Sequence, residues 1–173
     1  MSDGWPGDRG RHGGIDEIPL RGVPGRLWLC GKHYVGPDAE AALAAVGATT
    51  IVCLNEPHEL DDRYPDYVDW LARNQPDRAA WHPVADLHAP ALDEAVALVD
   101  DLHARLGRDE RLIVHCGAGK GRAGTVGVAL LLATGEPLER AQRIVADHRP
   151  GAGPEAGAQA ALLVALAGRT IPR

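Results

Sequence analysis

The sequence predicts a single α/β domain with a mostly parallel central sheet of four to five strands, flanked by helices. Short apolar stretches alternate along the chain with longer segments of helical periodicity. One stretch, residues 49–55 (TTIVCLN), is β-branched and apolar on both faces, which is typical of a buried parallel strand. A length of 173 residues with 45% apolar residues is enough for one domain with its own core.

Each expected element has a local signal in the sequence. Asp38 is placed to cap a helix that Gly47 ends, and the apolar residues of 92–106 recur at helical spacing. Residues 123–134 are apolar on nearly every side, so this helix should be buried. The expected strands are 26–30, 49–55, 80–84 and 111–115, and the expected helices are 39–46, 67–74, 92–106, 123–134, 138–148 and 155–167.

The start of the chain carries several glycines and no apolar run, so residues 1–22 are expected to form a flexible arm before a folded domain at 23–170. The arm does not have the pattern of a signal peptide. The longest apolar run, 126–133, is far shorter than the roughly 20 residues of a membrane span. Three cysteines are too few for a disulfide framework. We therefore expect a cytoplasmic protein that makes no membrane contact.

Charge and ligand spacing exclude two further classes of function. The chain has 18 Lys and Arg against 24 Asp and Glu, a net charge of −6, whereas general nucleic-acid binding needs a basic surface. No cluster of His, Cys and Asp has metal-ligand spacing, so we expect no metal and no other cofactor.

A glycine-rich loop follows the strand expected at 111–115, at the end of the sheet where ligands of parallel sheets bind. Residues 115–125 read HCGAGKGRAGT, and three of the five residues between Cys116 and Arg122 are glycine. Glycines allow successive backbone N–H groups to point at one anion, and the start of the next helix adds its positive end. No acidic residue lies in this segment, so nothing there repels a dianion.

The residue types in the loop fit attack on a phosphate ester. Arg122 can hold two phosphate oxygens with its planar guanidinium. The same positive field favours the thiolate of Cys116, a soft nucleophile beneath the bound phosphoryl group. The expected phosphate-binding residues are Gly117, Ala118, Gly119, Lys120, Gly121 and Arg122.

This strand–HC–five residues–RxGT–helix pattern resembles the signature loop of the cysteine-dependent protein tyrosine phosphatases, in their dual-specificity branch. The resemblance covers about residues 24–167 and implies a dual-specificity phosphatase fold, with Cys116 and Arg122 as catalytic residues. It also implies an acid on a mobile loop. Residues 81–90 (WHPVADLHAP) are similar to that loop, and HPVAD is similar to the acid loop of kinase-associated phosphatases. Asp86 would then protonate the leaving oxygen, while the rival Asp93 fits a helix start better.

Three further residues are expected to support the site. The segment Arg149-Pro150-Gly151 followed by Gln159 is similar to the one that closes the branch's catalytic domain, so Gln159 either places the hydrolytic water or is only a solvated or capping residue. The side chain of His115 should point away from the site and support the loop by hydrogen bonding. Thr125, in the first turn of the helix, is the third supporting residue.

Three positions leave alternatives open. Ala123 stands where the branch has Ser or Thr, whose hydroxyl bonds the departing thiolate, so phosphoenzyme breakdown should be slow unless Thr125 or a loop amide fills the gap. In the family, a Lys at the place of Lys120 occurs in phosphoinositide phosphatases, but it can equally be a surface Lys. Cys53 is either a thiol that resolves an oxidised Cys116 or an ordinary core residue.

The sequence therefore predicts a phosphomonoester hydrolase of the tyrosine or dual-specificity type, acting through a phosphocysteine. The alternatives are a phosphate-binding pseudophosphatase with little turnover, and a phosphoinositide or RNA 5′-phosphatase that uses the same loop. The expected partner is a phosphorylated substrate, in the first place a phosphoprotein. Nucleic acid is expected only as a substrate end, and the chain is expected to be a monomer.

Overall fold

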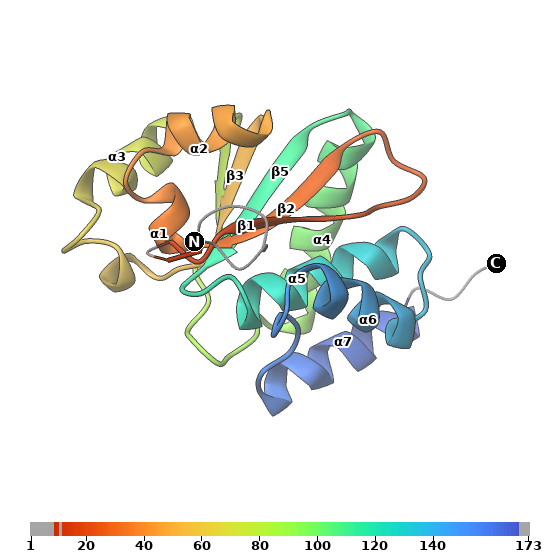
Figure 1. The fold of residues 1–173 in the computed structure, drawn as a ribbon. Helices are drawn as coiled ribbons and strands as arrows, with labels where there is room; N and C mark the ends of the chain where they lie inside the picture. Colours follow the sequence, from red (N-terminus) through yellow and green to blue (C-terminus); the bar gives the residue numbers. More distant parts are fainter. Residues whose placement is uncertain (1–8, 11, 170–173) are drawn as a thin grey trace.

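The computed structural model describes residues 9, 10 and 12–169. A five-stranded sheet forms its centre, in the order β1-β2-β5-β3-β4 (Figure 1). Strand β1 pairs antiparallel with β2, and the other neighbours are parallel, so the predicted fold class is confirmed. The strands are β1 (Ile15–Ile18), β2 (Arg26–Gly31), β3 (Thr50–Cys53), β4 (Ala79–Trp81) and β5 (Arg111–Cys116).

Helices cover both faces of the sheet. One face is covered by α1 (Lys32–Val35), α2 (Ala39–Val46) and α3 (Pro65–Asn74). A short 3₁₀ helix, η1, spans Pro57–Glu59. The other face is covered by α4 (Leu92–Gly107), α5 (Gly121–Ala133), α6 (Leu138–His148) and α7 (Gly157–Arg169). Asp38 caps α2 through a bond from the Ala41 N–H, and Gly47 ends that helix at a φ of 71°, as the sequence predicts.

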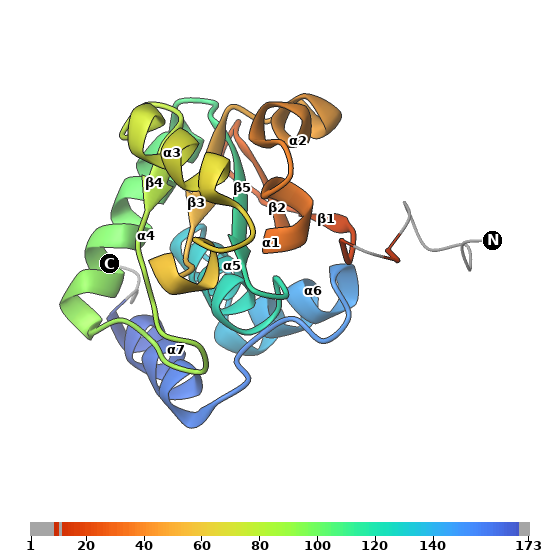
Figure 2. The ribbon, with the colours of Figure 1, turned by 90° about the vertical axis from the view of Figure 1, so that its left-hand side faces the viewer.

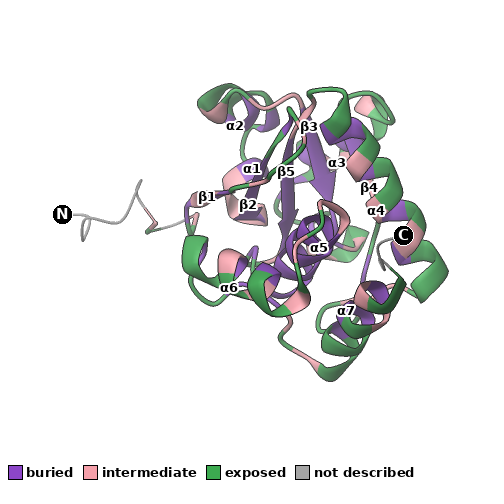
Figure 3. Ribbon diagram, turned by 90° about the vertical axis from the view of Figure 1, so that its right-hand side faces the viewer, coloured by how far each residue is buried: buried purple, intermediate pink, exposed green. Residues whose placement is uncertain are grey.

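Two cores result, because alternate residues of each buried strand point to opposite faces. Val52, Val114 and Cys116 pack with α4–α7, whereas Ile51, Cys53 and Ile113 pack with α1–α3. Helix α5 is buried along almost its whole length between the sheet and its neighbouring helices (Figure 3). This burial explains its nearly uniform apolar sequence, and it fixes the loop that leads into the helix.

The structure corrects the predicted N-terminal arm within residues 15–18, which form the edge strand β1 beside α6 (Figure 2). Asp16 and Ile18 both face inward there, and a carboxylate at a core position hides the alternation that identifies a strand. Residues 1–8 and 11 of the predicted arm lie outside the described residues. Strand β4 also ends earlier than expected, at Trp81, and the backbone beyond it belongs to a loop.

None of the described helices is long and apolar enough to cross a membrane.

Candidate active site

The glycine-rich loop lies at the carboxyl end of β5, between β2 and β3. Cys116 is the last residue of β5, and Gly121 is the first residue of α5. The loop forms the floor of an open pocket of about 880 Å³, whose wall includes Lys32, Asp86 and Lys120. The sequence predicted this place because ligands of parallel sheets bind beyond the carboxyl ends of the strands.

The backbone of the loop is held from outside by its carbonyl groups. The Gly117 carbonyl accepts from the Lys32 N–H at 3.0 Å, and the Arg149 guanidinium donates to the carbonyls of Ala118 (2.9 Å) and Gly119 (2.7 Å). In a trans peptide the N–H points opposite to the carbonyl. The N–H groups of Ala118, Gly119 and Lys120 therefore point to the inner side, and they bond to no group among the described residues. The loop presents preformed donors for an anion.

Gly119 of the loop and Gly124 of α5 are required by space. A Cβ on Gly119, whose φ is +73°, would lie 2.2 Å from the Cys30 carbonyl oxygen of β2. A Cβ on Gly124 would lie 2.2 Å from the Gly153 nitrogen. At Gly117 a Cβ would only touch the Arg122 side chain at 3.4 Å, so this position tolerates other residues.

The Cys116 thiol lines the same pocket as the loop and is 3% exposed. Its Sγ accepts a hydrogen bond from the backbone N–H of Ala123 at 3.4 Å. The Thr125 hydroxyl donates instead to the Gly121 carbonyl at 2.6 Å. Two donors were expected as substitutes for the hydroxyl that Ala123 does not have. The backbone amide bonds the sulfur, whereas the Thr125 hydroxyl bonds a carbonyl of its own helix.

Arg122 is buried beside the thiol with an incomplete set of partners. Its Nη1 donates to the Val84 carbonyl at 2.7 Å, and both Nη atoms bind the Glu59 carboxylate at 2.8 Å. Its Nε is buried and has no hydrogen-bond partner among the described residues. Burial opposes the charge of Arg122, but Glu59 and Cys116 raise its pKa, so the guanidinium stays positive. A buried donor with no partner, in the same pocket as inward-pointing amides, is suited to bind an anion.

Glu59 is the functional residue that the sequence reasoning missed. It ends η1, in the segment that follows β3. Its carboxylate accepts from the Asn55 side chain at 2.9 Å and from the Glu56 N–H at 2.7 Å, in addition to Arg122. Burial alone would raise the pKa of Glu59, but Arg122, Glu56 and Asn55 lower it to about 2. A carboxylate shortly after a strand that neighbours β5 is the signal that could have identified it.

The structure places Asp86 over the loop, at the tip of the segment that follows β4. Its side chain is 74% exposed, and its Oδ1 lies 3.5 Å from Arg122 Nη2. The segment is fixed on either side of Asp86: the Val84 N–H donates to the Leu54 carbonyl at 3.0 Å, and Gln159 donates to the His88 carbonyl at 3.2 Å. The rival Asp93 lies in the first turn of α4 and does not line the pocket of the thiol.

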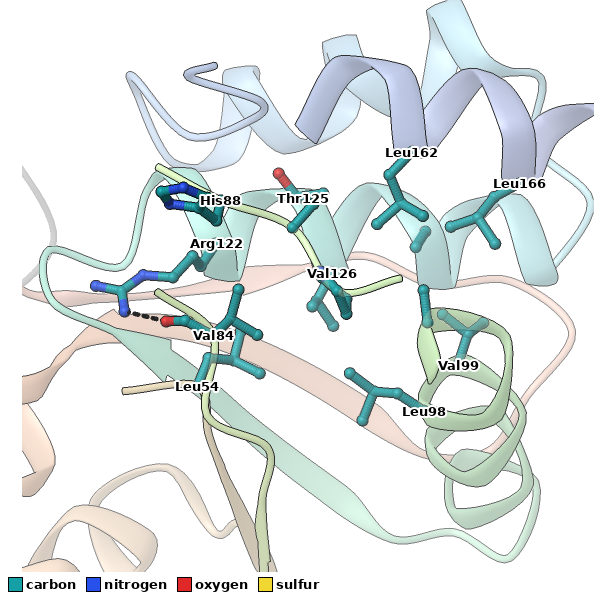
Figure 4. Close-up of a pocket in the computed structure, with 14 residues that line it drawn as sticks. Leu54, Val84, His88, Leu98, Val99, Arg122, Thr125, Val126, Leu162 and Leu166 are labelled. Carbon is teal, nitrogen blue, oxygen red and sulfur yellow. Dashed lines mark hydrogen bonds between the residues drawn. The ribbon is translucent and has the colours of Figure 1, made fainter. Parts of the chain in front are cut away.

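A small apolar cavity of about 20 Å³ lies behind this acid loop, between α4, α5 and α7 (Figure 4). Figure 4 shows Leu98, Val126 and Leu162 around it, and it shows the Arg122 guanidinium turned toward the Val84 carbonyl. His88, Arg122 and Thr125 are among its lining residues, but the surface of the cavity is almost wholly apolar, so it belongs to the packing of the acid loop and not to the site.

The two remaining supporting residues have defined partners. The Gln159 oxygen accepts from the Glu155 N–H at 2.7 Å while its nitrogen binds the acid loop, so both ends of the amide are occupied. His115 points to the opposite face of the sheet from Cys116, where it bonds the Tyr67 hydroxyl at 2.6 Å. Burial lowers the pKa of His115 to about 4, so the ring is neutral near pH 7, and its Nδ1 lies 3.4 Å from the Cys116 carbonyl oxygen.

Lys120 and Cys53 take contrasting places. Lys120 is exposed and lines the mouth of the pocket. Cys53 packs among α1–α3, on the other face of the sheet from Cys116, and burial raises its pKa to about 12. The geometry therefore gives Cys53 the character of a core residue. In the described part of the chain, no group of three or more His, Cys, Asp or Glu residues could hold a metal ion.

Comparison with known proteins gives one family. The family model PTP-SAK, described as "Swiss Army Knife protein, DSP-PTPase phosphatase domain", matches residues 23–169. No curated protein sequence matches the chain.

Several solved structures have a similar fold. Tk-PTP in its active form is 26% identical, with a TM-score of 0.66 over 88% of this chain and 97% of that one. A kinase-associated phosphatase with its catalytic cysteine replaced by serine is 22% identical, with a TM-score of 0.75 over 91% and 95%. PTPMT1 in complex with PI(5)P is 16% identical, with a TM-score of 0.70 over 90% and 96%.

Proposed function

We propose that this chain, which belongs to the PTP-SAK family of DSP-PTPase phosphatase domains and is a cysteine-dependent phosphatase, hydrolyses phosphomonoesters through a phosphocysteine at Cys116. One observation carries the proposal: the Cys116 thiol lines the same pocket as the inward-pointing backbone N–H groups and as Arg122, whose buried Nε has no hydrogen-bond partner among the described residues. This arrangement supplies a nucleophile and a fixed set of donors for the same dianion.

The first chemical step transfers the phosphoryl group to sulfur. The Cys116 thiolate attacks phosphorus in line, so an S–P bond forms while the P–O bond to the leaving group breaks. The leaving oxygen takes a proton from Asp86, whose exposed side chain lies on the solvent side of Arg122. The loop amides and Arg122 hold the non-transferring oxygens throughout this step.

The second step releases inorganic phosphate. A water molecule attacks phosphorus, Asp86 accepts its proton, and the S–P bond breaks to return the thiolate. The Ala123 N–H is the donor that the structure places on this sulfur. We assign Gln159 to positioning the acid loop, because both ends of its amide are already hydrogen-bonded.

We further propose that the catalytic domain spans residues 23–170, with β1 as an added edge strand, and that the chain acts as a monomer. The three cysteines are free, which supports a reducing compartment such as the cytoplasm. A phosphoprotein is the proposed substrate.

Lys120 favours a second candidate substrate class, because this exposed cation at the mouth of the pocket could bind a further phosphate of a phosphoinositide. A panel of phosphotyrosine and phosphothreonine peptides, phosphoinositides and RNA with a 5′-phosphate separates these classes by kcat/KM. If Lys120→Ala lowers kcat/KM for phosphoinositides only, the second class is supported. An equal effect on all substrates assigns Lys120 to general phosphate attraction.

Steady hydrolysis of para-nitrophenyl phosphate tests the proposed reaction. Wild type should turn over, Cys116→Ser should not, and Cys53→Ala should match wild type because that thiol lies on the other face of the sheet. If wild type binds phosphate but does not turn over, the chain is the pseudophosphatase alternative. Turnover by Cys116→Ser above a mock preparation would contradict the mechanism.

A further inference from the structure

Asp16 is a carboxylate in the place of a core residue. It lies on β1 opposite Leu29 of β2, and its side chain is only 7% exposed. Burying an ionised carboxylate is costly unless charged donors surround it. Two arginines do so: Arg149 donates to its Oδ2 at 2.7 Å, and Arg9 donates to its Oδ1.

Arg149 has the same buried character and joins Asp16 to the phosphate loop. Its side chain is 2% exposed, and three of its nitrogens point to different partners. Nη1 binds Asp16, Nη2 binds the Ala118 carbonyl at 2.9 Å, and Nε binds the Gly119 carbonyl at 2.7 Å. The planar guanidinium therefore transmits the position of β1 to two successive peptide units of the loop.

From this chain of contacts we infer that Asp16 is a positioning residue for phosphate binding and acts through Arg149; the inference rests on the proposed phosphatase function. The carbonyls that Arg149 holds belong to the peptides whose N–H groups, those of Gly119 and Lys120, point to the inner side. Asp16 binds the third edge of the guanidinium at 2.7 Å, where the Gly14 carbonyl accepts from the same nitrogen only at 3.4 Å, and so holds the guanidinium toward the loop. Asp16 touches neither the substrate nor the thiol.

The positioning of the phosphate loop by Asp16 is a property of the N-terminal segment. Asp16 precedes residues 23–169, which the family model matches. The same segment contributes His12 and Gly13 to the wall of the site pocket. Strand β1 also packs on α6, the helix that Arg149 follows, so both ends of the contact are fixed.

The test compares Asp16→Asn with Glu17→Gln in the full chain. Glu17 is the next residue on the same strand, but its carboxylate is exposed and binds Arg26. Competitive inhibition by inorganic phosphate and orthovanadate is measured together with kcat and KM for para-nitrophenyl phosphate. Asp16→Asn should raise both inhibition constants about ten- to a hundredfold, because the loop donors lose their alignment. Glu17→Gln should match wild type.

A double-variant cycle tests the route through Arg149. In an Arg149→Lys background, Asp16→Asn should have little further effect on the inhibition constants. If Asp16→Asn does not fold, Asp16→Glu retains the charge and takes its place; it should give a smaller rise with the same dependence on Arg149. Unchanged constants in a folded Asp16 variant, an equal effect of Glu17→Gln, or full additivity with Arg149→Lys would overturn the inference.

The inference and the proposed reaction can fail separately. Phosphate binding does not require turnover, so it can be measured in Cys116→Ser as protection by inorganic phosphate against thermal unfolding. The same variant with Asp16→Asn added should show weaker protection. Wild type without turnover, but with phosphate protection that depends on Asp16, would refute only the proposed reaction. Turnover that depends on Cys116, with phosphate inhibition constants that do not depend on Asp16, would refute only the role of Asp16.

Discussion

The phosphate loop, residues 117–120, and the acid loop, residues 82–91, meet at Arg122 but are held in different ways. In the phosphate loop the carbonyls of Gly117, Ala118 and Gly119 are bound from outside by Lys32 and Arg149. In the acid loop, hydrogen bonds hold both backbone groups of Val84 and the carbonyl of His88. The Asp86 side chain between these residues is 74% exposed.

This difference fits the two chemical tasks. Donors that stabilise a developing charge act best when they need no rearrangement during the reaction, so the loop that binds phosphate is built rigidly. An acid that meets a leaving group and then a water molecule must adapt to two partners, and the side chain of Asp86 is accordingly exposed at the tip of its segment. The comparison predicts that changes in the acid loop alter the proton step, whereas changes around the phosphate loop alter binding and breakdown of the intermediate.

The largest expected effect concerns Asp86. Asp86→Ala should lower kcat by roughly 10²–10⁴, the usual contribution of a positioned acid. Substrate binding should be retained, because the donors of the phosphate loop remain in place. The loss should shrink for aryl phosphates whose leaving groups need no proton, and steady-state kinetics over such a series measures it.

Asp93→Ala is the matched control for Asp86. Asp93 lies in the first turn of α4 and does not line the site pocket, so this variant should keep the wild-type leaving-group dependence. If Asp93→Ala shows the loss and Asp86→Ala does not, the acid is wrongly assigned.

A second effect concerns the stability of the pair between Glu59 and Arg122. The pKa of Glu59 is lowered from 4.5 to about 2 in the folded chain. The pair therefore contributes stability above pH 4.5 that is lost as the pH falls toward about 2. The shift corresponds to at most about 3 kcal/mol, reduced by solvent screening because the carboxylate is 14% exposed. Denaturant unfolding between pH 7 and pH 2 should show this loss in wild type.

The variant Glu59→Gln should be less stable than wild type at pH 7, and it should show a flatter decline below pH 4.5. Glu40→Gln serves as its control, because the exposed pair of Glu40 with Arg78 is expected to contribute under about 1 kcal/mol. Equal stability of Glu59→Gln and wild type at pH 7 would show that the charge of Glu59 does not hold Arg122.

A smaller effect concerns the thiolate as leaving group. Ala123 offers sulfur only a backbone N–H, at 3.4 Å. Ala123→Ser should add a hydroxyl donor of about 1.5–3 kcal/mol, which corresponds to a roughly ten- to hundredfold gain in kcat with little change in kcat/KM. Wild type should show a stoichiometric burst of product in stopped flow, and the serine variant should lose it.

Ala123→Gly controls for the change of side chain at this position, and it should retain the burst. No burst in wild type, or no gain in kcat for Ala123→Ser, would mean that the Ala123 N–H already stabilises the departing thiolate sufficiently.

The sequence predicted the features that depend on residues close together in the chain. The loop from Cys116 to Arg122 could be identified because its glycines, cysteine and arginine are contiguous, and α5 could be identified because its burial leaves it almost wholly apolar. The parts that were missed depend on distant partners. From the sequence alone, Asp16 has the character of a loop residue and Glu59 that of a surface acid. Their roles depend on the ion pairs with Arg149 and Arg122, which only the structure shows.

Trapping of the covalent intermediate shows whether the reaction passes through Cys116. Wild type is mixed with para-nitrophenyl phosphate, quenched in acid within the first turnover and digested, and the peptides are analysed by mass spectrometry. We predict one added phosphoryl group on the peptide that contains Cys116, absent from Cys116→Ser and reduced in Ala123→Ser. Turnover with no phosphoryl group on Cys116, or with one on another residue, would contradict this prediction.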